Sequence, residues 1–228
     1  MTTRILEVRQ GVLNKNDQLA RGLRERFREA GVLVLNLVSS PGTGKTAFLE
    51  RTLAELVRRG EPAAALVGDL ETDRDARRLA ASGAPVKQIN THGRCHLEAE
   101  VVGAHLEDWD LPGLRYLFIE NVGNLVCPSS YDLGEDLRVV LLSVTEGEDK
   151  PLKYPGIFNS SDLAVLTKWD LAEACEFDDA AATENLHSVR PGLPVLRVSA
   201  KTGFGMEGWL DFLAARRADK PITAASLA

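Results

Sequence analysis

The segment SSPGTGKT (39–46) has the composition and spacing of a loop that binds phosphate groups. Its two glycines allow the backbone to curl so that successive N–H groups point toward one anion. Lys45 would then reach the β- and γ-phosphates of a nucleotide, and Thr46 would bind Mg²⁺. The segment departs from the pattern G-x-x-x-x-G-K-[ST] at Ser39, where glycine is usual. The expected nucleotide contacts in this loop are Gly42, Thr43, Gly44, Lys45, Thr46 and Ala47.

Two later segments, TKWD (167–170) and SAKT (199–202), indicate which base the nucleotide carries. Both resemble the guanine-reading elements of P-loop GTPases. Asp170 can accept hydrogen bonds from N1 and N2 of guanine, whereas it would face an acceptor at N1 of adenine. The stem of Lys168 can cover the base, and the Ala200 amide can donate to its oxygen. GTP is therefore favoured over ATP, with Lys168, Asp170, Ser199, Ala200 and Lys201 as the expected contacts.

Carboxylates near two predicted strand ends are candidates for magnesium binding and catalysis. GDLETDRDA (68–76) follows a predicted strand and contains Asp69 and Asp73. Glu120 ends another strand at the position where a Walker-B carboxylate holds metal-bound water. Solvated loop carboxylates are the alternative interpretation, which is stronger for Asp73 than for Asp69 or Glu120. We expect Lys45, Asp69 and Glu120 to act in catalysis, and Thr46, Asp69 and Glu120 to bind magnesium.

Cysteine and histidine side chains suggest a second, softer metal site. Cys95 and His96 are adjacent at the start of a predicted helix, where the helix N-terminus would favour a thiolate. With Cys127 they would form a set of two sulfurs and one imidazole, which suits Ni²⁺ or Zn²⁺ and leaves a position open. Glu100, one helical turn after His96, could supply an oxygen. Spacing alone also allows ordinary packing, and Cys175 has no obvious partner.

Apolar runs and helical periodicity place these residues on alternating strands and helices. This pattern predicts an α/β fold with a mostly parallel sheet of about seven strands flanked by helices, as in P-loop NTPases. We expect a helical extension over 1–31, one GTPase domain over 32–217 and a flexible tail over 218–228. The predicted strands lie in 32–38, 63–70, 85–89, 114–121, 137–144, 161–170 and 193–200, and the predicted helices in 14–31, 46–60, 72–83, 94–109 and 205–217.

Composition limits the function further. The chain has 228 residues, a net charge of −6 and three cysteines. It has no basic patch rich in aromatic residues, so nucleic acid is an improbable partner. The charged N-terminal sequence does not read as a secretory signal, and no apolar run is long enough to span a membrane. We therefore expect a cytoplasmic protein that does not bind membranes.

Seven segments in order resemble the HypB family of nickel-inserting GTPases in [NiFe]-hydrogenase maturation. They are SSPGTGKT, GDLETDRDA, GRCHLEAE, ENVGNLVCPSSYDLGED, SVTEGEDKPLKYP, TKWDL and SAKTGFGM, within about 31–217. The resemblance implies the SIMIBI class of P-loop fold and a GTP-dependent homodimer. It also implies a metal site of Cys95, His96 and Cys127 near the dimer interface. The related UreG family shares the phosphate loop but differs after the Walker-B strand.

The resemblance implies a slow, Mg²⁺-dependent GTPase that delivers Ni²⁺ with a HypA-type nickel carrier to the hydrogenase large subunit. Many family members carry an N-terminal cysteine motif or a histidine-rich run, and MTTRILEVRQ has neither. Relatives also often have histidine where this chain has Glu100. Three alternatives stay open: a related GTPase serving urease or another metalloenzyme, a metal-binding module in which nucleotide only drives dimerisation, and a small-molecule kinase.

Overall fold

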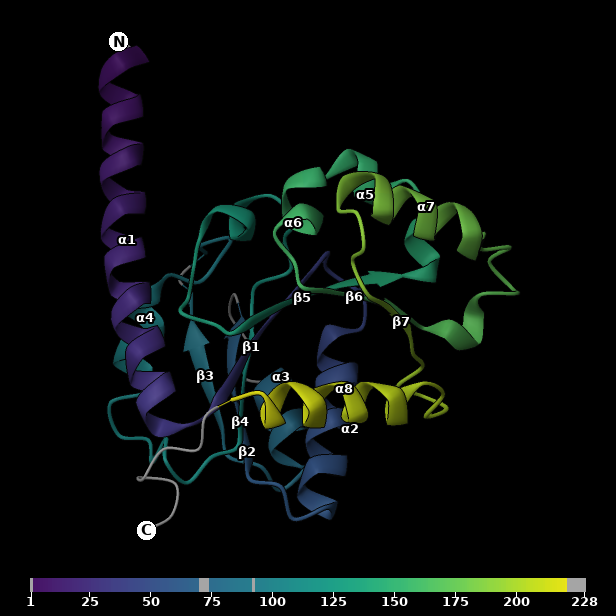
Figure 1. The fold of residues 1–228 in the computed structure, drawn as a ribbon, viewed down its shortest axis with the longest axis horizontal. Coiled ribbons are helices and arrows are strands. Elements are labelled where there is room, and N and C mark those ends of the chain that lie inside the picture. Colours follow the sequence, from purple (N-terminus) through teal and green to yellow (C-terminus); the bar gives the residue numbers. More distant parts are fainter. Residues whose placement is uncertain (1, 70–73, 92, 221–228) are drawn as a thin grey trace.

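The sheet consists of seven parallel strands in the order β3-β2-β4-β1-β5-β6-β7 (Figure 1). The computed structural model describes residues 2–69, 74–91 and 93–220, without the side chains of residues 2–10, 69, 74 and 75. The predicted α/β class is confirmed, and every strand pair is parallel. The strands are β1 (Leu33–Ser39), β2 (Ala63–Asp69), β3 (Val86–Asn90), β4 (Tyr116–Glu120), β5 (Leu137–Ser143), β6 (Leu163–Thr167) and β7 (Val195–Arg197).

Helices cover both faces of the sheet, and this explains why its central strands are mostly apolar, with exceptions such as Asn36 in β1 and Arg138 in β5. On one face, Phe48 and Trp209 pack against alternate leucines of β1, including Leu35. Val34, between those leucines, points to the other face and packs with Phe27. The first face is covered by α2 (Lys45–Arg58), α3 (Arg74–Ala80) and α8 (Met206–Ala218). The second is covered by α1 (Thr2–Ala30), α4 (Ala99–His105), α5 (Lys150–Lys153), α6 (Pro155–Asn159) and α7 (Asp179–Val189).

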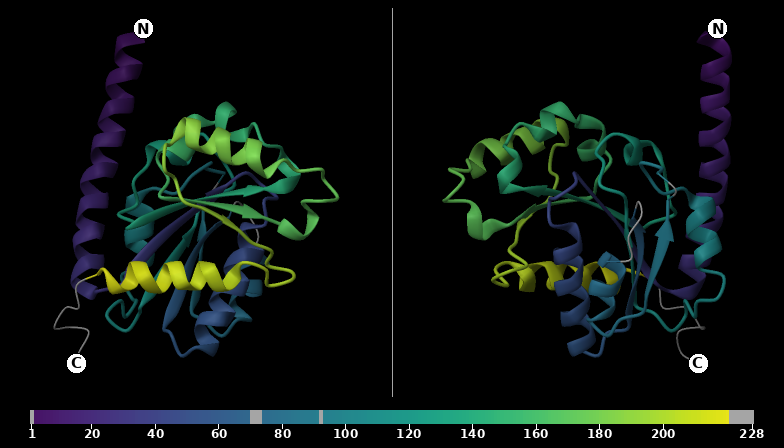
Figure 2. Two further views of the ribbon diagram at one scale, coloured as in Figure 1. Left: turned by 45° about the vertical axis from the view of Figure 1, so that its right-hand side comes forward. Right: turned by 180° about the vertical axis from the view of Figure 1, so that it is seen from behind.

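The N-terminal helix is longer than the predicted 14–31 and differs along its length. Its C-terminal half packs onto the domain through Ala20, Leu23 and Phe27, all buried. Its first half extends past the rest of the molecule (Figure 2). It ends at Ala30 as predicted, because Gly31 takes a φ of 67° in the left-handed region.

The predicted helix over 94–109 is wrong at both ends, since α4 covers only Ala99–His105. Residues 93–98 form bends and turns instead. Leu97 is fully buried here, and a Cβ built on Gly68 of β2 would lie 2.9 Å from Leu97 Cγ. This contact with the strand holds the segment extended, and the Glu98 backbone is still extended (φ −119°, ψ 151°) immediately before α4. Cys95 and His96 therefore do not lie at a helix N-terminus.

Helices α5, α6 and α7 were not predicted because their apolar patterns are weak. The two short helices begin at or next to prolines 151 and 155, and in α7 only Ala182 and Leu186 are buried. At the C-terminal end, α8 includes Ala218, which we expected to belong to the tail, and residues 221–228 lie outside the described part. Among the described helices, none combines the length and apolar character needed to cross a membrane.

Candidate nucleotide and metal sites

The loop predicted to bind phosphate joins the end of β1 to the start of α2. Gly42 and Gly44 have φ angles of 76° and 97°, which side-chain-bearing residues rarely adopt. Ser39 is the buried last residue of β1 and is not among the described non-glycine residues with positive φ. The departure from the glycine pattern therefore introduces no backbone strain. The first turn of α2, beginning at Lys45, directs free N–H groups toward the loop.

Lys45, Thr46 and Glu120 lie together beside this loop. Glu120 Oε1 accepts a hydrogen bond from Thr46 Oγ1 at 2.7 Å and lies 3.3 Å from Lys45 Nζ. Glu120 is 3% exposed, and its Oε2 is buried without a hydrogen-bond partner in the described structure. Such an oxygen fits a bound cation or its water shell. The residues present are therefore suited to Mg²⁺. The hollow is lined by residues 40–47, Val67, Gly68, Arg78, Glu120, Val122 and Gly123.

The acidic residues predicted to follow β2 are only partly described. The Asp69 backbone ends β2 and lies in register with Asn90 of β3. Its side chain and all of Asp73 lie outside the described part of the chain. The backbone position alone sets Asp69 at the carboxyl edge of the sheet, next but one to the strand that carries the phosphate loop.

A second hollow lies next to the first and shares Gly44 and Ala47 with it. Lys168, Asp170, Ala200 and Lys201 line it, together with Gly44, Ala47, Phe48, Thr167, Leu171 and Val198. Ser199 Oγ donates to Asp170 Oδ1 at 2.6 Å and so fixes the carboxylate. Lys201 Nζ lies 4.0 Å from Asp170 Oδ2, with its side chain 81% exposed. The structure thus brings together the five residues predicted to contact guanine.

Lys168 ties this base-side hollow to the phosphate loop. It adopts φ 55°, one of two described non-glycine residues with positive φ. Its Nζ donates to Gly42 O at 2.8 Å, and its neighbour Thr167 donates through Oγ1 to Thr43 O at 2.7 Å. Strained backbone of this kind is held in place only by surrounding contacts. The two predicted nucleotide motifs therefore form one continuous groove.

The phosphate loop also has a support that the motifs did not indicate. Glu146 Oε2 accepts from Thr43 Oγ1 at 2.7 Å, and Lys150 Nζ donates to Ser40 Oγ at 3.1 Å. Glu146 and Lys150 form an ion pair of 3.3 Å. Burial disfavours the Glu146 carboxylate, but hydrogen bonds from Thr43 and the Ser143 backbone N–H outweigh it, so the pKa of Glu146 is lowered. The signal was the TEGEDK segment (145–150), which carried the family resemblance without an assigned role.

The structure brings Cys95, His96 and Cys127 together, although they come from segments far apart in the sequence. Their ligand atoms all lie within 4.8 Å of one another. Cys95 Sγ lies 2.7 Å from Cys127 Sγ and 3.5 Å from His96 Nδ1. Cys127 begins a short 3₁₀ helix, Cys127–Ser130, rather than following a strand directly.

The protonation of this trio differs from the expectation of a thiolate stabilised by a helix. The hydrogen bond to Cys127, then burial and the charge of Cys127, raise the pKa of Cys95. The Cys95 thiol donates to Cys127 Sγ, so the hydrogen bond favours its protonated form, and burial disfavours the thiolate further. Burial lowers the pKa of His96, so its imidazole is neutral, as a metal ligand must be.

The two ring nitrogens of His96 face different neighbours. Nδ1 lies 3.5 Å from Cys95 Sγ and is the nitrogen placed to bind a metal with it, whereas Nε2 is buried without a hydrogen-bond partner in the described structure and lies 3.6 Å from Glu98 Oε1. The Tyr131 ring lies against the imidazole, with ring centroids 3.8 Å apart. Two sulfurs and an imidazole of this kind suit Ni²⁺ or Zn²⁺.

Glu100 and Cys175 are not part of the trio. Glu100 forms an exposed ion pair with Lys15 of α1 at 3.0 Å and is not part of the described metal-ligand cluster. His96 precedes α4, so the helical spacing that suggested Glu100 as a fourth ligand does not apply. Cys175 is exposed and also outside the cluster. His92 lies outside the described residues.

Comparison with known proteins shows the family to which the chain is similar. Residues 33–197 match the family CobW/HypB/UreG, nucleotide-binding domain. A protein named hydrogenase maturation factor HypB from Azotobacter vinelandii is 50% identical over 215 residues, covering 94% of this chain and 71% of the relative. The hydrogenase/urease maturation factor HypB from Helicobacter pylori is 40% identical over 212 residues, covering 91% and 86%.

A solved structure shows the same fold. The crystal structure of HypB from Helicobacter pylori in complex with nickel superimposes with a TM-score of 0.85 and 40% identity, covering 92% of this chain and 98% of that one. The family match, the high identity over most of the chain and the shared fold lead to one assignment. The chain belongs to the HypB family within the CobW/HypB/UreG group of nucleotide-binding proteins.

Proposed function

We propose that this protein is a GTP-hydrolysing nickel metallochaperone that helps insert nickel into the [NiFe]-hydrogenase large subunit. The observation that carries the proposal is the trio of Cys95, His96 and Cys127 on a fold that also carries the two adjacent hollows lined by the predicted nucleotide motifs. The segment from Glu120 to Cys127 belongs to both sites. The names of the relatives, hydrogenase maturation factors, support the same role.

In the nucleotide groove, the chain's own residues would bind and orient GTP. Asp170, fixed by Ser199, would accept from guanine, while Lys168 and Lys201 would border the base. Lys45 would move from Glu120 to the β- and γ-phosphates. Mg²⁺ held by Thr46, Asp69 and Glu120 would neutralise charge on those phosphates. Asp69 is our candidate for orienting the water that attacks the γ-phosphate, in a slow hydrolysis.

In the metal site, nickel is the cargo. Two thiolates and a neutral imidazole would bind it and leave one position open, which suits transfer to another protein better than storage. Zn²⁺ has the same preference for these ligands and could occupy the site in its place. Because thiols must lose protons on binding, nickel uptake would release protons.

The transfer reaction needs partners. We propose a homodimer promoted by GTP, with the trio near its interface, a HypA-type nickel carrier as donor and the hydrogenase large subunit as recipient. The site would work in the cytoplasm. Residues 32–217 would form the GTPase domain, with residues 1–31 as a helical extension and 218–228 as a tail.

A single titration tests the proposal. Ni²⁺ is added to the metal-free protein with GDP or with a non-hydrolysable GTP analogue, and thiolate-to-nickel charge-transfer absorption is followed. We expect a band that disappears in Cys127→Ala and whose midpoint depends on the nucleotide. A band of equal midpoint with both nucleotides would contradict coupling through residues 120–127. The absence of any band in the native protein would remove nickel as the cargo.

Two other functions remain as candidates. The Helicobacter pylori relative is named a hydrogenase/urease maturation factor, which makes urease an alternative recipient. Pull-down from cells that contain both enzymes would separate the two. In the other candidate, nucleotide drives only dimerisation. Steady-state release of phosphate at a rate that follows nickel transfer would exclude it.

A further inference from the structure

The three metal-binding candidates come from two segments that have little regular structure of their own. The first metal arm, residues 93–99, carries Cys95 and His96 and consists of a turn, a bend and irregular backbone up to Ala99, where α4 begins. The second metal arm, residues 124–132, carries Cys127 in a 3₁₀ helix of four residues. Two arms of this kind keep three ligand atoms within 4.8 Å only if other groups fix them to each other.

One such group is the side chain of Asn16 on α1. Its Oδ1 accepts from the Ala99 N–H at 2.9 Å, at the end of the first metal arm. Its Nδ2 donates to Asp132 O at 2.8 Å, at the end of the second metal arm. Asn16 is 5% exposed, whereas its neighbours Lys15 and Gln18 are exposed. A single buried amide thus joins both arms.

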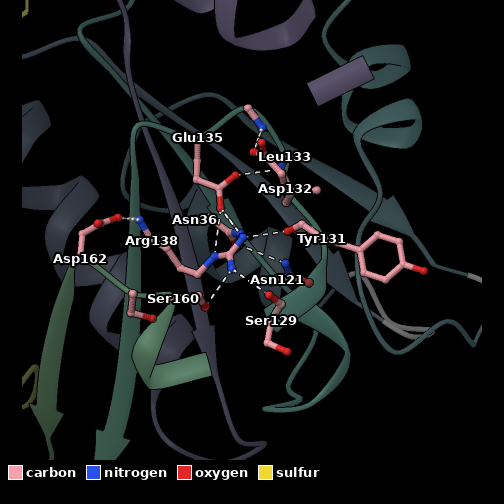
Figure 3. Close-up of polar contacts among 12 residues, drawn as sticks. Asn36, Asn121, Ser129, Tyr131, Asp132, Leu133, Glu135, Arg138, Ser160 and Asp162 are labelled. Atoms are coloured by element: carbon pink, nitrogen blue, oxygen red, sulfur yellow. Dashed lines mark hydrogen bonds and ion pairs between the residues drawn. The ribbon is translucent and has the colours of Figure 1, made fainter. Parts of the chain in front are cut away.

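A second connection between the arms runs through buried side chains, of which Asn121, Asn36, Glu135 and Arg138 are drawn in Figure 3. Asn121 Oδ1 accepts from the Leu97 N–H of the first metal arm at 3.1 Å. Asn121 Nδ2 donates to Asn36 Oδ1 at 3.2 Å, and Asn36 Nδ2 donates to Glu135 Oε1 at 3.0 Å. Each amide uses both its donor and its acceptor, so the chain has a fixed direction.

The chain ends on the second metal arm through Arg138. Its guanidinium pairs with Glu135 Oε1 at 2.8 Å, with the two side chains only 10% and 6% exposed. It donates to Tyr131 O at 2.8 Å and to Ser129 O at 3.4 Å, both on the second metal arm. Glu135 Oε2 accepts from the Leu133 N–H at 2.7 Å. Buried charges require such full pairing, and a planar guanidinium reaches several carbonyls at once.

We propose that Asn16 and Arg138 are positioning residues of the metal site, which hold its two arms at ligand-binding distance without touching the metal. The inference rests on the proposed function, because it takes the trio to be a nickel site. It gives a role to two features that the nucleotide motifs leave unused, the N-terminal helix and the YDLGED segment (131–136). Removing groups that orient metal ligands typically weakens metal binding about ten- to a hundredfold.

The experiment uses two probes of the same site in the full-length chain. Ni²⁺ titration reports affinity, and the charge-transfer band at saturating nickel reports ligand geometry. Phenylarsine oxide needs no nickel, since it condenses with two neighbouring thiols to a cyclic dithioarsinite and releases one water. Cys127→Ala lacks the pair of thiols, so it gives the background signal of both probes.

Asn16→Ala is the main variant, because alanine keeps α1 helical while removing both bridging hydrogen bonds. We expect about tenfold weaker nickel binding, a shifted band and about tenfold weaker arsenical capture. Asn16→Asp keeps the acceptor for the Ala99 N–H but turns a buried carboxylate oxygen toward the Asp132 carbonyl, so its effects should be at least as large as those of Asn16→Ala. Arg138→Lys should produce the same three changes as Asn16→Ala through the second connection.

Lys15→Ala is the matched control. Lys15 is the neighbour of Asn16, and its ion pair with Glu100 also joins α1 to α4, but both side chains are more than 60% exposed. We expect Lys15→Ala to leave affinity, band and arsenical capture unchanged. Thermal unfolding of the metal-free variants separates loss of geometry from loss of folding.

The outcomes are distinct. If Asn16→Ala and Arg138→Lys are folded and match the native protein in both probes, the inference is overturned. It is also overturned if affinity falls only in proportion to the unfolded fraction while the band at saturation stays in place. If the native protein binds no nickel but the variants lose arsenical capture, the positioning role stands and the proposed function fails.

Discussion

The nucleotide groove and the metal trio are built in opposite ways. The groove uses residues at or just after the ends of parallel strands, and each strand brings its own residue to the same edge of the sheet. The trio uses two irregular segments joined by buried amides and one buried ion pair. The first construction is local to each motif, whereas the second depends on residues far apart in the sequence. The two sites should therefore respond to different mutations.

Lys45→Ala should produce the largest difference between its effect on the nucleotide site and its effect on the metal site. Loss of the ammonium removes charge neutralisation at the phosphates, so GTP hydrolysis should fall by about a hundredfold or more. Arsenical capture by Cys95 and Cys127 should be unchanged, because Lys45 contacts neither metal arm. Phosphate release and capture measured on one preparation check this. A loss of both would mean that the two sites are one mechanical unit.

An intermediate effect is expected from Asp170→Asn. The carboxamide loses an acceptor for guanine, so GTP affinity should fall by about ten- to a hundredfold, from one to two charged hydrogen bonds. Its new N–H group can donate to the C2 oxygen of xanthine, so xanthosine triphosphate should bind better than GTP. Competition between the two nucleotides measures the switch. An unchanged preference would place the base elsewhere than the hollow beside Lys168.

The smallest effect is expected from Glu146→Gln, which tests the support of the phosphate loop. The amide loses the charge that pairs with Lys150, so GTP affinity should fall by a few-fold, about the value of one hydrogen bond. The pKa of Glu146 is lowered on folding, so its contribution to stability is complete above its ordinary value of 4.5 and is lost as the pH falls through the folded pKa. The native protein should therefore lose more stability than Glu146→Gln between about pH 5 and pH 3, measured by thermal unfolding. If the stability of the native protein and that of Glu146→Gln fall equally over this pH range, the prediction is wrong.

The residues of the nucleotide groove could be placed from the sequence because they follow strands that are largely apolar. Glycine spacing, Lys45 and the TKWD segment each have a local physical meaning, and parallel strands bring them together without further information. Asp170 and Ser199 are 29 positions apart, yet both follow neighbouring strands. The alternation of strands and helices was sufficient to bring them together.

The metal arms could be predicted only in part. Residue types suggested Cys95, His96 and Cys127, but the predicted helix over 94–109 begins only at Ala99, because Leu97 is buried against β2 instead of lying on a helical stripe. No local pattern announces that Asn16 bonds to both Ala99 and Asp132, since such bonds depend on how α1 docks. The periodicity of apolar residues gives no indication of buried polar contacts between residues far apart in the sequence.

Gly68 shows how closely the two sites constrain each other. Gly68 directly precedes Asp69, a predicted residue of the nucleotide site. The atoms that fill the space beside Gly68 belong to Leu97, the neighbour of His96. A methyl group at position 68 would meet three Leu97 carbons at 2.9 to 3.0 Å. Substitutions at this position of β2 are thus restricted by Leu97, which belongs to the first metal arm. In a survey of substitutions selected for nickel transfer, changes of Gly68 should be rejected as often as changes of a metal ligand such as Cys95, although Gly68 has no side chain to bind a metal.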